Sequence, residues 1–254
     1  MANLKPPTIV IVSGGWHVPE SYSKLVDALK SAGYNVLAPR LPSMNESRPP
    51  TANLETDTSF VRSFVQDLIT TGHNIVALMH SYGGQVGTNA LNGLGESETP
   101  GSGRVSQLIY MTAFAQNEGW SMIDKVEEFG HGDLMPLAFD FADDKTVVSR
   151  DPKLLLVGGT TLPEAEVDAY INTFVRWNGQ CMYDKISEAA WKGIPTSYIY
   201  TTQDMTVPLD YQKSMVEIMR KGGREVRTFE VESGHCPNFS ATSSVVDAVK
   251  EILG

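Results

Sequence analysis

The chain has 254 residues with 20 basic and 30 acidic side chains, which gives a net charge of −10 at pH 7. Apolar residues make up 41% and charged residues 20%, a composition typical of globular proteins. The acidic balance argues against nucleic acid or an anionic membrane surface as a partner, because both select for clusters of Lys and Arg. No run of about 18 apolar residues is present, so the sequence predicts no membrane-spanning helix.

The amino-terminal residues lack an apolar core of signal-peptide length, and the first apolar run, residues 9–12, is short enough to be a strand. The chain has two cysteines, Cys181 and Cys236, which are too few for a disulfide framework. These features favour a reducing, cytoplasmic compartment.

Short apolar runs alternate with helical patterns along most of the chain, which is typical of a parallel sheet wrapped by helices. Six apolar runs predict strands at residues 8–13, 34–38, 74–79, 105–113, 196–201 and 225–231. Helical patterns follow at residues 20–32, 60–69 (with Asp57 or Thr58 as the cap), 82–94, 209–220 and 243–253. We therefore expect an α/β fold with a mainly parallel central sheet of about six strands, flanked by helices.

One long segment breaks this alternation. Residues 114–195 show no convincing buried strand but are rich in aromatic and Met side chains. A structureless loop of about 80 residues would be implausible in a compact domain. We interpret the segment as a mostly helical insertion that forms a cap over the strand ends, on a core of residues 1–113 and 196–254. The alternative is a continuation of the sheet with poorly marked strands.

The sequence MHSYGG falls where a predicted strand meets a predicted helix. A serine at such a junction, followed by glycine two residues later, is typical of a nucleophile elbow, the tight turn that lifts a serine hydroxyl above the sheet. Ser81 and Gly83 fit this pattern, whereas Met79 stands where the elbow usually has a small residue. The alternative is that Ser81 only caps the following helix.

A serine needs a base and an acid to become a nucleophile. Asp204 follows the predicted strand at residues 196–201, and His235 follows the one at residues 225–231. Because the carboxyl ends of parallel strands meet at one edge of a sheet, both side chains can reach Ser81. The order Ser, acid, His along the chain is the one that this topology requires. Asp210 is the alternative acid, in which case Asp204 would only stabilise a turn.

Four other histidines compete with His235 for the role of base. His73 precedes a strand at the opposite edge of the sheet, and His131 lies in the cap. His80 adjoins the serine but is expected to point away from its hydroxyl. His17 lies in the loop after the first strand and is a candidate for the wall of the pocket.

An oxyanion hole needs two backbone N–H donors. Tyr82, directly after the serine, is expected to supply one, and the loop SGGWH the other. Gly15 is the expected donor in that loop and Trp16 the alternative, because glycines let the backbone approach a substrate closely. A plain Gly-Gly turn without this role is the competing interpretation. The expected pocket residues come from this loop and the cap: Trp16, His17, Trp120, Met122 and Phe129.

Four segments in order, SGGWHVPESY, MHSYGG, TTQDMTVP and SGHCPNFS, resemble the α/β-hydrolase superfamily. They are most similar to its small serine esterases, which include plant methylesterases and hydroxynitrile lyases, and the likeness covers nearly the whole chain. The resemblance implies an α/β-hydrolase fold with a helical cap, a Ser81–His235–Asp204 triad and an oxyanion hole from Gly15 and Tyr82. It also implies no metal and no organic cofactor.

Together these observations predict a serine hydrolase that cleaves an ester or lactone of a small apolar substrate through an acyl-enzyme. An alternative on the same scaffold is a biosynthetic enzyme of a secondary metabolite, such as a cyclase, lactonase or decarboxylase, because a fold does not determine a substrate. A hydroxynitrile lyase is less favoured, since similar lyases place a lysine directly after the catalytic histidine and this chain has Cys236. A ligand receptor that keeps the triad is a further alternative. A homodimer is a possible assembly of the chain.

Overall fold

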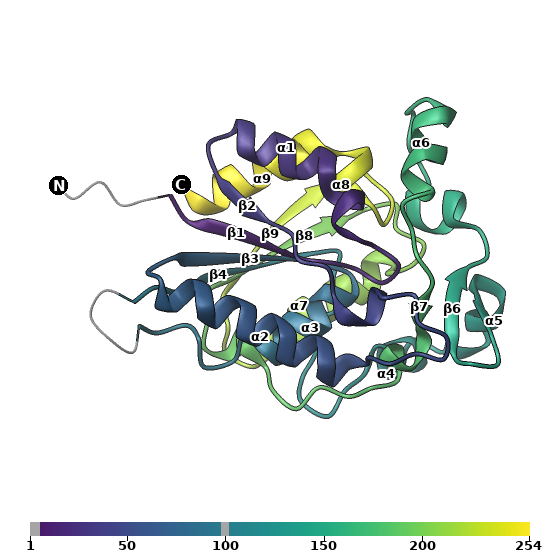
Figure 1. Cartoon of the computed structure of the whole chain (residues 1–254), viewed down its shortest axis with the longest axis horizontal. Coiled ribbons are helices and arrows are strands. Elements are labelled where there is room, and N and C mark those ends of the chain that lie inside the picture. The colour runs from purple at the N-terminus through teal and green to yellow at the C-terminus, as the bar shows by residue number, and fades with distance from the viewer. Residues whose placement is uncertain (1–5, 98–101) are drawn as a thin grey trace.

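The computed structural model describes residues 6–97 and 102–254 (Figure 1). Residues 1–5, which entered the prediction about a signal peptide, lie outside the described residues. Within these residues the central sheet has six strands: β1 (Thr8–Val12), β2 (Asn35–Leu37), β3 (Asn74–His80), β4 (Arg104–Met111), β8 (Thr196–Thr201) and β9 (Val226–Val231). They lie in the order β2-β1-β3-β4-β8-β9, and every pair is parallel. The predicted fold class is confirmed.

Helices cover both faces of the sheet (Figure 1). They are α1 (Ser23–Ser31), α2 (Leu54–Thr70), α3 (Tyr82–Ala90), α7 (Leu209–Lys221), α8 (Pro237–Ser240) and α9 (Thr242–Leu253). None of the helices in the described ranges is both long and apolar enough to cross a membrane.

The apolar strands are buried because their side chains supply two separate cores. Along β1, Ile9 and Ile11 join the cluster beneath α1 and α9, whereas Val10 and Val12 join the cluster beneath α2, α3 and α7. Successive side chains of a strand point to opposite faces, so a strand covered on both faces needs a continuous apolar run. This is why the strand signals in the sequence are unbroken.

The largest differences between the expected and the observed helix boundaries concern α2 and α3. Helix α2 begins at Leu54, and its cap is Asn53, whose side chain accepts a hydrogen bond from the Thr56 N–H. Asp57 lies inside the helix, where it is fully buried, so its role as a cap was predicted wrongly. Helix α3 ends at Ala90, before the expected residue 94.

The segment between β4 and β8 contains the short helices α4 (Met122–Glu128), α5 (Met135–Ala138) and α6 (Glu164–Ile171). It also contains a second, antiparallel sheet of β5 (Phe139–Phe141), β6 (Thr146–Ser149) and β7 (Trp177–Asn178), which the sequence analysis missed. These strands are too short to show a period of two in the sequence. The segment, called the cap below, lies beyond the carboxyl ends of the central strands (Figure 1).

Candidate active site

Ser81 lies in the tight turn between β3 and α3, with φ of 53° and ψ of −122°. Residues other than glycine rarely adopt a positive φ, and such strain is concentrated at functional sites. The turn depends on Gly83, because a Cβ at that position would lie 2.1 Å from the Val12 carbonyl oxygen. Helix α3 therefore packs directly on the backbone of β1, and the serine is lifted above the sheet.

The structure explains how Met79 is accommodated in this elbow. Met79 is fully buried, and its thioether packs against α3 at Gly87. A Cβ on Gly87 would lie 2.3 Å from the Met79 sulfur. The small residue that usually stands on the strand is thus replaced by a small residue on the facing helix.

Ser81, His235 and Asp204 meet at the carboxyl edge of the sheet, and all three are buried. The Ser81 Oγ lies 2.8 Å from His235 Nε2, and His235 Nδ1 lies 2.7 Å from an Asp204 oxygen. In a neutral imidazole the nitrogen facing a carboxylate carries the proton, so Nε2 is left to accept from the serine hydroxyl. Asp210, the alternative acid, lies in the first turn of α7 instead.

The Asp204 carboxylate is anchored by further hydrogen bonds. The N–H groups of Thr206 and Val207 donate to Oδ1 at 2.7 and 2.8 Å, which is the turn role considered for this residue. The hydroxyls of Thr112 and Thr201 donate to Oδ2, the oxygen that also faces the histidine. Sequence reasoning missed Thr112, because nothing local marks a threonine after β4 as a partner of a residue about ninety positions later.

The other histidines do not contact the serine hydroxyl. His80 points away from it and bonds the backbone carbonyl of His235 through Nε2 at 2.7 Å. His131 lies in the cap, with Nδ1 2.6 Å from the hydroxyl of Tyr211. His73 directly precedes β3, at the opposite edge of the sheet. Among the five histidines of the chain, His235 is therefore the one whose ring contacts the Ser81 hydroxyl.

The loop after β1 lies next to the serine. A Cβ on Gly14 would lie 3.1 Å from the Ser81 Cβ, and one on Gly15 would lie 2.7 Å from the Trp177 ring. Within the described residues, the backbone N–H groups of Gly15 and Trp16 donate no hydrogen bond. The Tyr82 N–H opens helix α3, where the first N–H groups have no partner within the helix. Free donors therefore stand on both sides of the serine.

A cavity opens at Ser81 beneath the cap, and its wall is almost entirely apolar. Thr206 supplies the other side-chain hydroxyl in this wall. Apolar walls with few polar groups are typical of small-molecule sites. The lining residues are Gly15, Trp16, Ser81, Phe114, Met122, Ile123, Val126, Met135, Phe139, Trp177, Met182 and Thr206. Trp16 and Met122 were expected there.

Three of the expected lining residues lie elsewhere, because each packs against a different neighbour. His17 is fully buried, and its Nδ1 bonds a backbone carbonyl of the first loop. The Trp120 ring lies 5.4 Å from the Lys125 Nζ, and Phe129 packs on Tyr211 with ring centroids 4.5 Å apart. An aromatic-rich cap could be read from the sequence, but the sequence did not reveal which rings face the serine.

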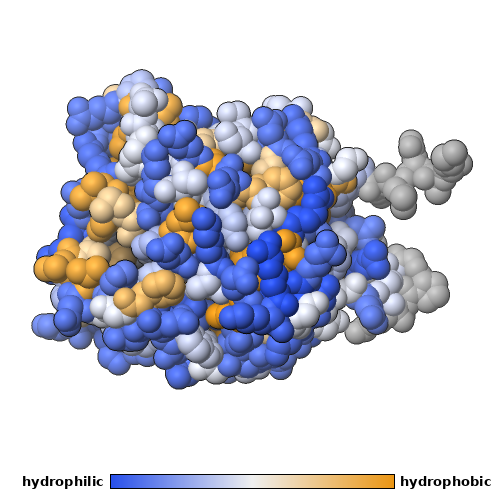
Figure 2. Space-filling view, turned by 180° about the vertical axis from the view of Figure 1, so that it is seen from behind, coloured by the Kyte–Doolittle hydropathy of each residue, from blue (hydrophilic) through white to orange (hydrophobic). Residues whose placement is uncertain are grey.

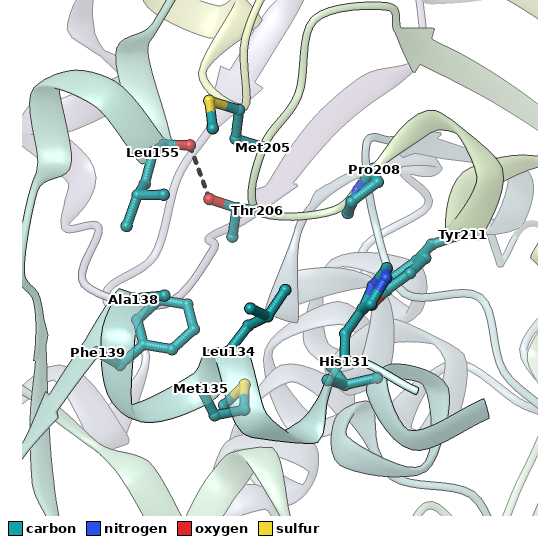
Figure 3. A pocket seen from close by; sticks show the side chains of 11 residues that line it. His131, Leu134, Met135, Ala138, Phe139, Leu155, Met205, Thr206, Pro208 and Tyr211 are labelled. Carbon is teal, nitrogen blue, oxygen red and sulfur yellow. Dashed lines mark hydrogen bonds between the residues drawn. The ribbon is translucent and has the colours of Figure 1, made fainter. Parts of the chain in front are cut away.

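A second pocket, drawn in Figure 3, adjoins this cavity. The two share four lining residues: Val126, Met135, Phe139 and Thr206. At the outer pocket, Leu134 and Met205 are 52% and 55% exposed, so apolar side chains reach the surface there. Hydrophobic side chains also gather at the cap end of the molecule when it is seen from behind (Figure 2). An apolar path therefore leads from the surface toward the serine.

In the described part of the chain, no group of three or more His, Cys, Asp and Glu side chains has an arrangement that could hold a metal ion.

The chain matches the model of the "Alpha/beta hydrolase family" over residues 9–248, so it belongs to this family. The "Probable hydrolase R7" of Phoma sp. is 27% identical to it, with 98% of each chain covered. The "Alpha/beta hydrolase nvfD" of Aspergillus novofumigatus is 28% identical, with 98% of this chain and 97% of that one covered. The superfamily resemblance drawn from the motifs is confirmed.

Two solved structures of esterases have a similar fold. Polyneuridine aldehyde esterase matches with a TM-score of 0.79 and 20% identity, covering 98% of this chain and 100% of the other. The methylesterase MES16 from Arabidopsis matches with a TM-score of 0.76 and 17% identity, covering 97% and 98%. At these identities the likeness shows the fold alone.

Proposed function

We propose that this protein is a serine hydrolase that cleaves an ester or lactone of an apolar substrate through an acyl-enzyme. The proposal is carried by the hydrogen-bonded row of Ser81, His235 and Asp204, with Ser81 Oγ 2.8 Å from the histidine. The serine also lines the apolar cavity, so its hydroxyl is open to a substrate. A nucleophile within reach of a base that is itself oriented by an acid is the signature of covalent catalysis.

In the first half-reaction, the Ser81 oxygen attacks the substrate carbonyl while His235 Nε2 takes the hydroxyl proton. Asp204 accepts from Nδ1–H, which holds the required tautomer and stabilises the imidazolium. The negative charge on the carbonyl oxygen is held by the Tyr82 N–H and the Gly15 N–H, with Trp16 N–H as the alternative second donor. Collapse of the intermediate expels the alcohol, which receives the proton from His235.

In the second half-reaction, water attacks the acyl-serine and His235 takes its proton. The same N–H groups hold the second oxyanion, and the acid leaves when the proton returns to Ser81. No step requires a metal or an organic cofactor, because the nucleophile, the base and the oxyanion donors all come from the chain.

The cavity wall supports an apolar substrate. Its side chains offer no charged group near Ser81, and the outer pocket prolongs the apolar surface past Met135 and Phe139. Burial of apolar area is worth about 25 cal/mol per Å², so this surface favours a hydrophobic group over a charged one. We infer that the carbonyl sits at the serine and that a hydrophobic group extends toward Leu134 and Met205.

The position after His235 argues against a hydroxynitrile lyase. Cys236 is fully buried, and its sulfur lies 3.5 Å from His17 Nε2. It is not among the residues that line the cavity at Ser81. A cationic side chain that could hold cyanide is therefore missing at this position.

The test is turnover of p-nitrophenyl esters of increasing chain length, together with labelling by a fluorophosphonate probe. Ser81→Ala should lower kcat by about 10⁴-fold or more and abolish labelling, because it removes the nucleophile. The matched control is Ser197→Ala, since Ser197 is equally buried but lies on β8 away from the cavity. Wild-type turnover no faster than that of Ser81→Ala would contradict the proposal and favour a ligand receptor.

A further inference from the structure

The loop that carries the proposed oxyanion donor contains two adjacent glycines and one internal backbone hydrogen bond, from the His17 N–H to the Gly14 carbonyl. Gly14 and Gly15 are required by close packing, since a Cβ on Gly14 would lie 2.9 Å from His80 Nδ1 and one on Gly15 would meet the Trp177 ring. Glycine, however, allows more backbone conformations than any other residue. The geometry of the Gly15 N–H therefore depends on contacts from outside the loop.

A first chain of hydrogen bonds reaches this loop from β3. The Gly14 N–H donates to the Tyr22 hydroxyl at 2.8 Å, and that hydroxyl lies 2.7 Å from His80 Nδ1. His80 Nε2 lies 2.7 Å from the carbonyl oxygen of His235. A carbonyl only accepts, so Nε2 carries the proton, Nδ1 accepts, and the Tyr22 hydroxyl must donate to it. Each donor in this series of hydrogen bonds has one acceptor, and all donors point the same way along the series.

A second chain reaches the same loop from the other side. His17 Nδ1 donates to the Gly15 carbonyl at 2.6 Å, so its Nε2 accepts from the Tyr170 hydroxyl at 3.0 Å. The Tyr170 hydroxyl in turn accepts from the Asn238 side-chain amide at 3.0 Å. Asn238 lies on α8, directly after the loop of His235. Both chains thus join the first loop to the segment that carries the proposed base.

Burial of the two histidines keeps the donor-to-acceptor direction of both series of hydrogen bonds constant. His17 and His80 are almost fully buried, and desolvation lowers the pKa of His17 to about 3 and the pKa of His80 well below its ordinary value. Both rings are therefore neutral near pH 7, with one donor and one acceptor each. A charged ring would have two donors and would leave a tyrosine hydroxyl without its acceptor.

We propose that Tyr22, His80 and His17 are positioning residues for the reaction at Ser81. The bonds to the Gly14 N–H and the Gly15 carbonyl hold the two peptide groups that flank the Gly15 N–H. The bond from His80 holds the backbone of His235. The hydrogen bonds in this way hold the proposed oxyanion donor and the proposed base, which lie far apart in the sequence, at a constant relative position. The inference rests on the proposed serine hydrolase function.

The first experiment compares two buried tyrosines. Tyr22→Phe removes the hydroxyl that bridges Gly14 and His80, whereas the control Tyr110→Phe removes an equally buried hydroxyl bonded to Thr88. With a p-nitrophenyl ester, kcat of Tyr22→Phe should fall about 10- to 100-fold with KM changed less than about twofold, because a misplaced donor weakens transition-state binding only. Its affinity for a trifluoromethyl ketone, which forms a tetrahedral adduct with the serine, should fall in parallel. Tyr110→Phe should leave all three quantities unchanged within about twofold.

The second experiment uses a pair of substitutions at His17. His17→Leu removes the donor to the Gly15 carbonyl, and kcat should fall by about 10-fold or more. His17→Asn places an amide N–H near the former Nδ1 and should recover most of this loss, although its bond to Tyr170 is gone. A purely structural role would make the two variants lose thermal stability and activity together.

The outcomes separate this inference from the function on which it rests. The positioning role alone would be overturned if kcat is unchanged in both Tyr22→Phe and His17→Leu, or if these variants change only KM. The positioning role is also overturned if kcat of Tyr110→Phe falls as far as that of Tyr22→Phe, or if kcat of His17→Asn is as low as that of His17→Leu. A wild-type protein that neither hydrolyses esters nor reacts with the fluorophosphonate would overturn the proposed function and this inference with it. If Tyr22→Phe fails to fold, the His17 pair decides the question.

Discussion

The Asp204 carboxylate accepts hydrogen bonds at both oxygens, and only one of these bonds comes from His235. Two backbone N–H groups of its own turn hold Oδ1, and two threonine hydroxyls share Oδ2 with the imidazole. An amide has one acceptor and one donor end, so it can satisfy one of these sides but not both. The site therefore requires a carboxylate at this position.

Asp204→Asn should lower kcat by about 10⁴-fold, because an amide N–H facing His235 favours the wrong tautomer of the imidazole. If the amide nitrogen instead faces the turn, the N–H groups of Thr206 and Val207 lose their acceptor, and the free energy of unfolding should fall by about 1–3 kcal/mol. Ester turnover and urea unfolding measure the two effects. Asp210→Asn is the control, since that carboxylate lies in the first turn of α7 and should change kcat little. Equal losses in both variants would remove Asp204 from the proposed role.

At the scale of elements, the junction of β3 and α3 departs from the usual elbow and compensates for it. Met79 is large and fully buried, so the facing position of α3 must be small. Gly87 provides that space, although glycine inside a helix is about 1 kcal/mol less favourable than alanine. Packing between strand and helix here outweighs the intrinsic preference of the helix.

Gly87→Ala should therefore destabilise the protein by about 1–3 kcal/mol, because the new methyl meets the fully buried Met79 thioether. In a Met79→Ala background the same substitution should instead stabilise by up to about 1 kcal/mol, since only helix propensity remains. A double-mutant cycle of urea unfolding measures both values. Independent, additive effects would show that the two residues do not compete for the same space.

Under the proposed function, the cap elements are expected to decide how far a substrate can extend. Met135 of α5 lines both the cavity at Ser81 and the outer pocket drawn in Figure 3, so we expect its side chain to border the passage between them. Leu137 of the same helix is 72% exposed and lines neither. The two residues form a matched pair for a test of chain-length selectivity.

Met135→Ala should raise the ratio of kcat/KM for p-nitrophenyl octanoate over that for the acetate by about 10-fold, because the passage widens for a long chain. Leu137→Ala should leave this ratio unchanged. Steady-state kinetics on the two esters decide the matter. A ratio that responds to Leu137→Ala, or not at all, would place the substrate chain elsewhere.

At the scale of the whole molecule, the site depends on two neutral histidines in its interior. Burial lowers the pKa of His17 from 6.5 to about 3, and the pKa of His80 falls well below 6.5 for the same reason. Both rings take up a proton only when the chain unfolds. At a pH between these values the unfolded state therefore binds more protons at these two rings than the folded state does, so their contribution to stability falls as the pH falls below about 6.5.

Each of these two rings should lower the free energy of unfolding by up to about 1.4 kcal/mol per pH unit on acidification from pH 6.5. Urea unfolding at several pH values between 5 and 7 measures the slope. His17→Asn lacks one of the two titrating groups, so its slope should be smaller by about one proton. Parallel slopes for the two proteins would show that His17 is already protonated in the folded state.

Local patterns in the sequence were enough to predict the central sheet and the meeting of Ser81, Asp204 and His235. Strands buried on both faces leave unbroken apolar runs, and helices leave a period near 3.6, so both could be read locally. The parallel order then brought the three strand ends to one edge. No contact had to be known for this step, because topology alone supplied the proximity.

The side chains that surround Ser81, His235 and Asp204 could be identified only in the folded chain. The cap strands are too short to leave a pattern, and the places of Trp120 and Phe129 follow from packing against neighbours that the sequence does not mark. Thr112 and Tyr22 reach the site through hydrogen bonds to residues distant in the chain. Each of these contacts is one hydrogen bond between two residues and leaves no periodic pattern in the sequence. It can therefore be found only in the folded chain, where donor and acceptor lie together.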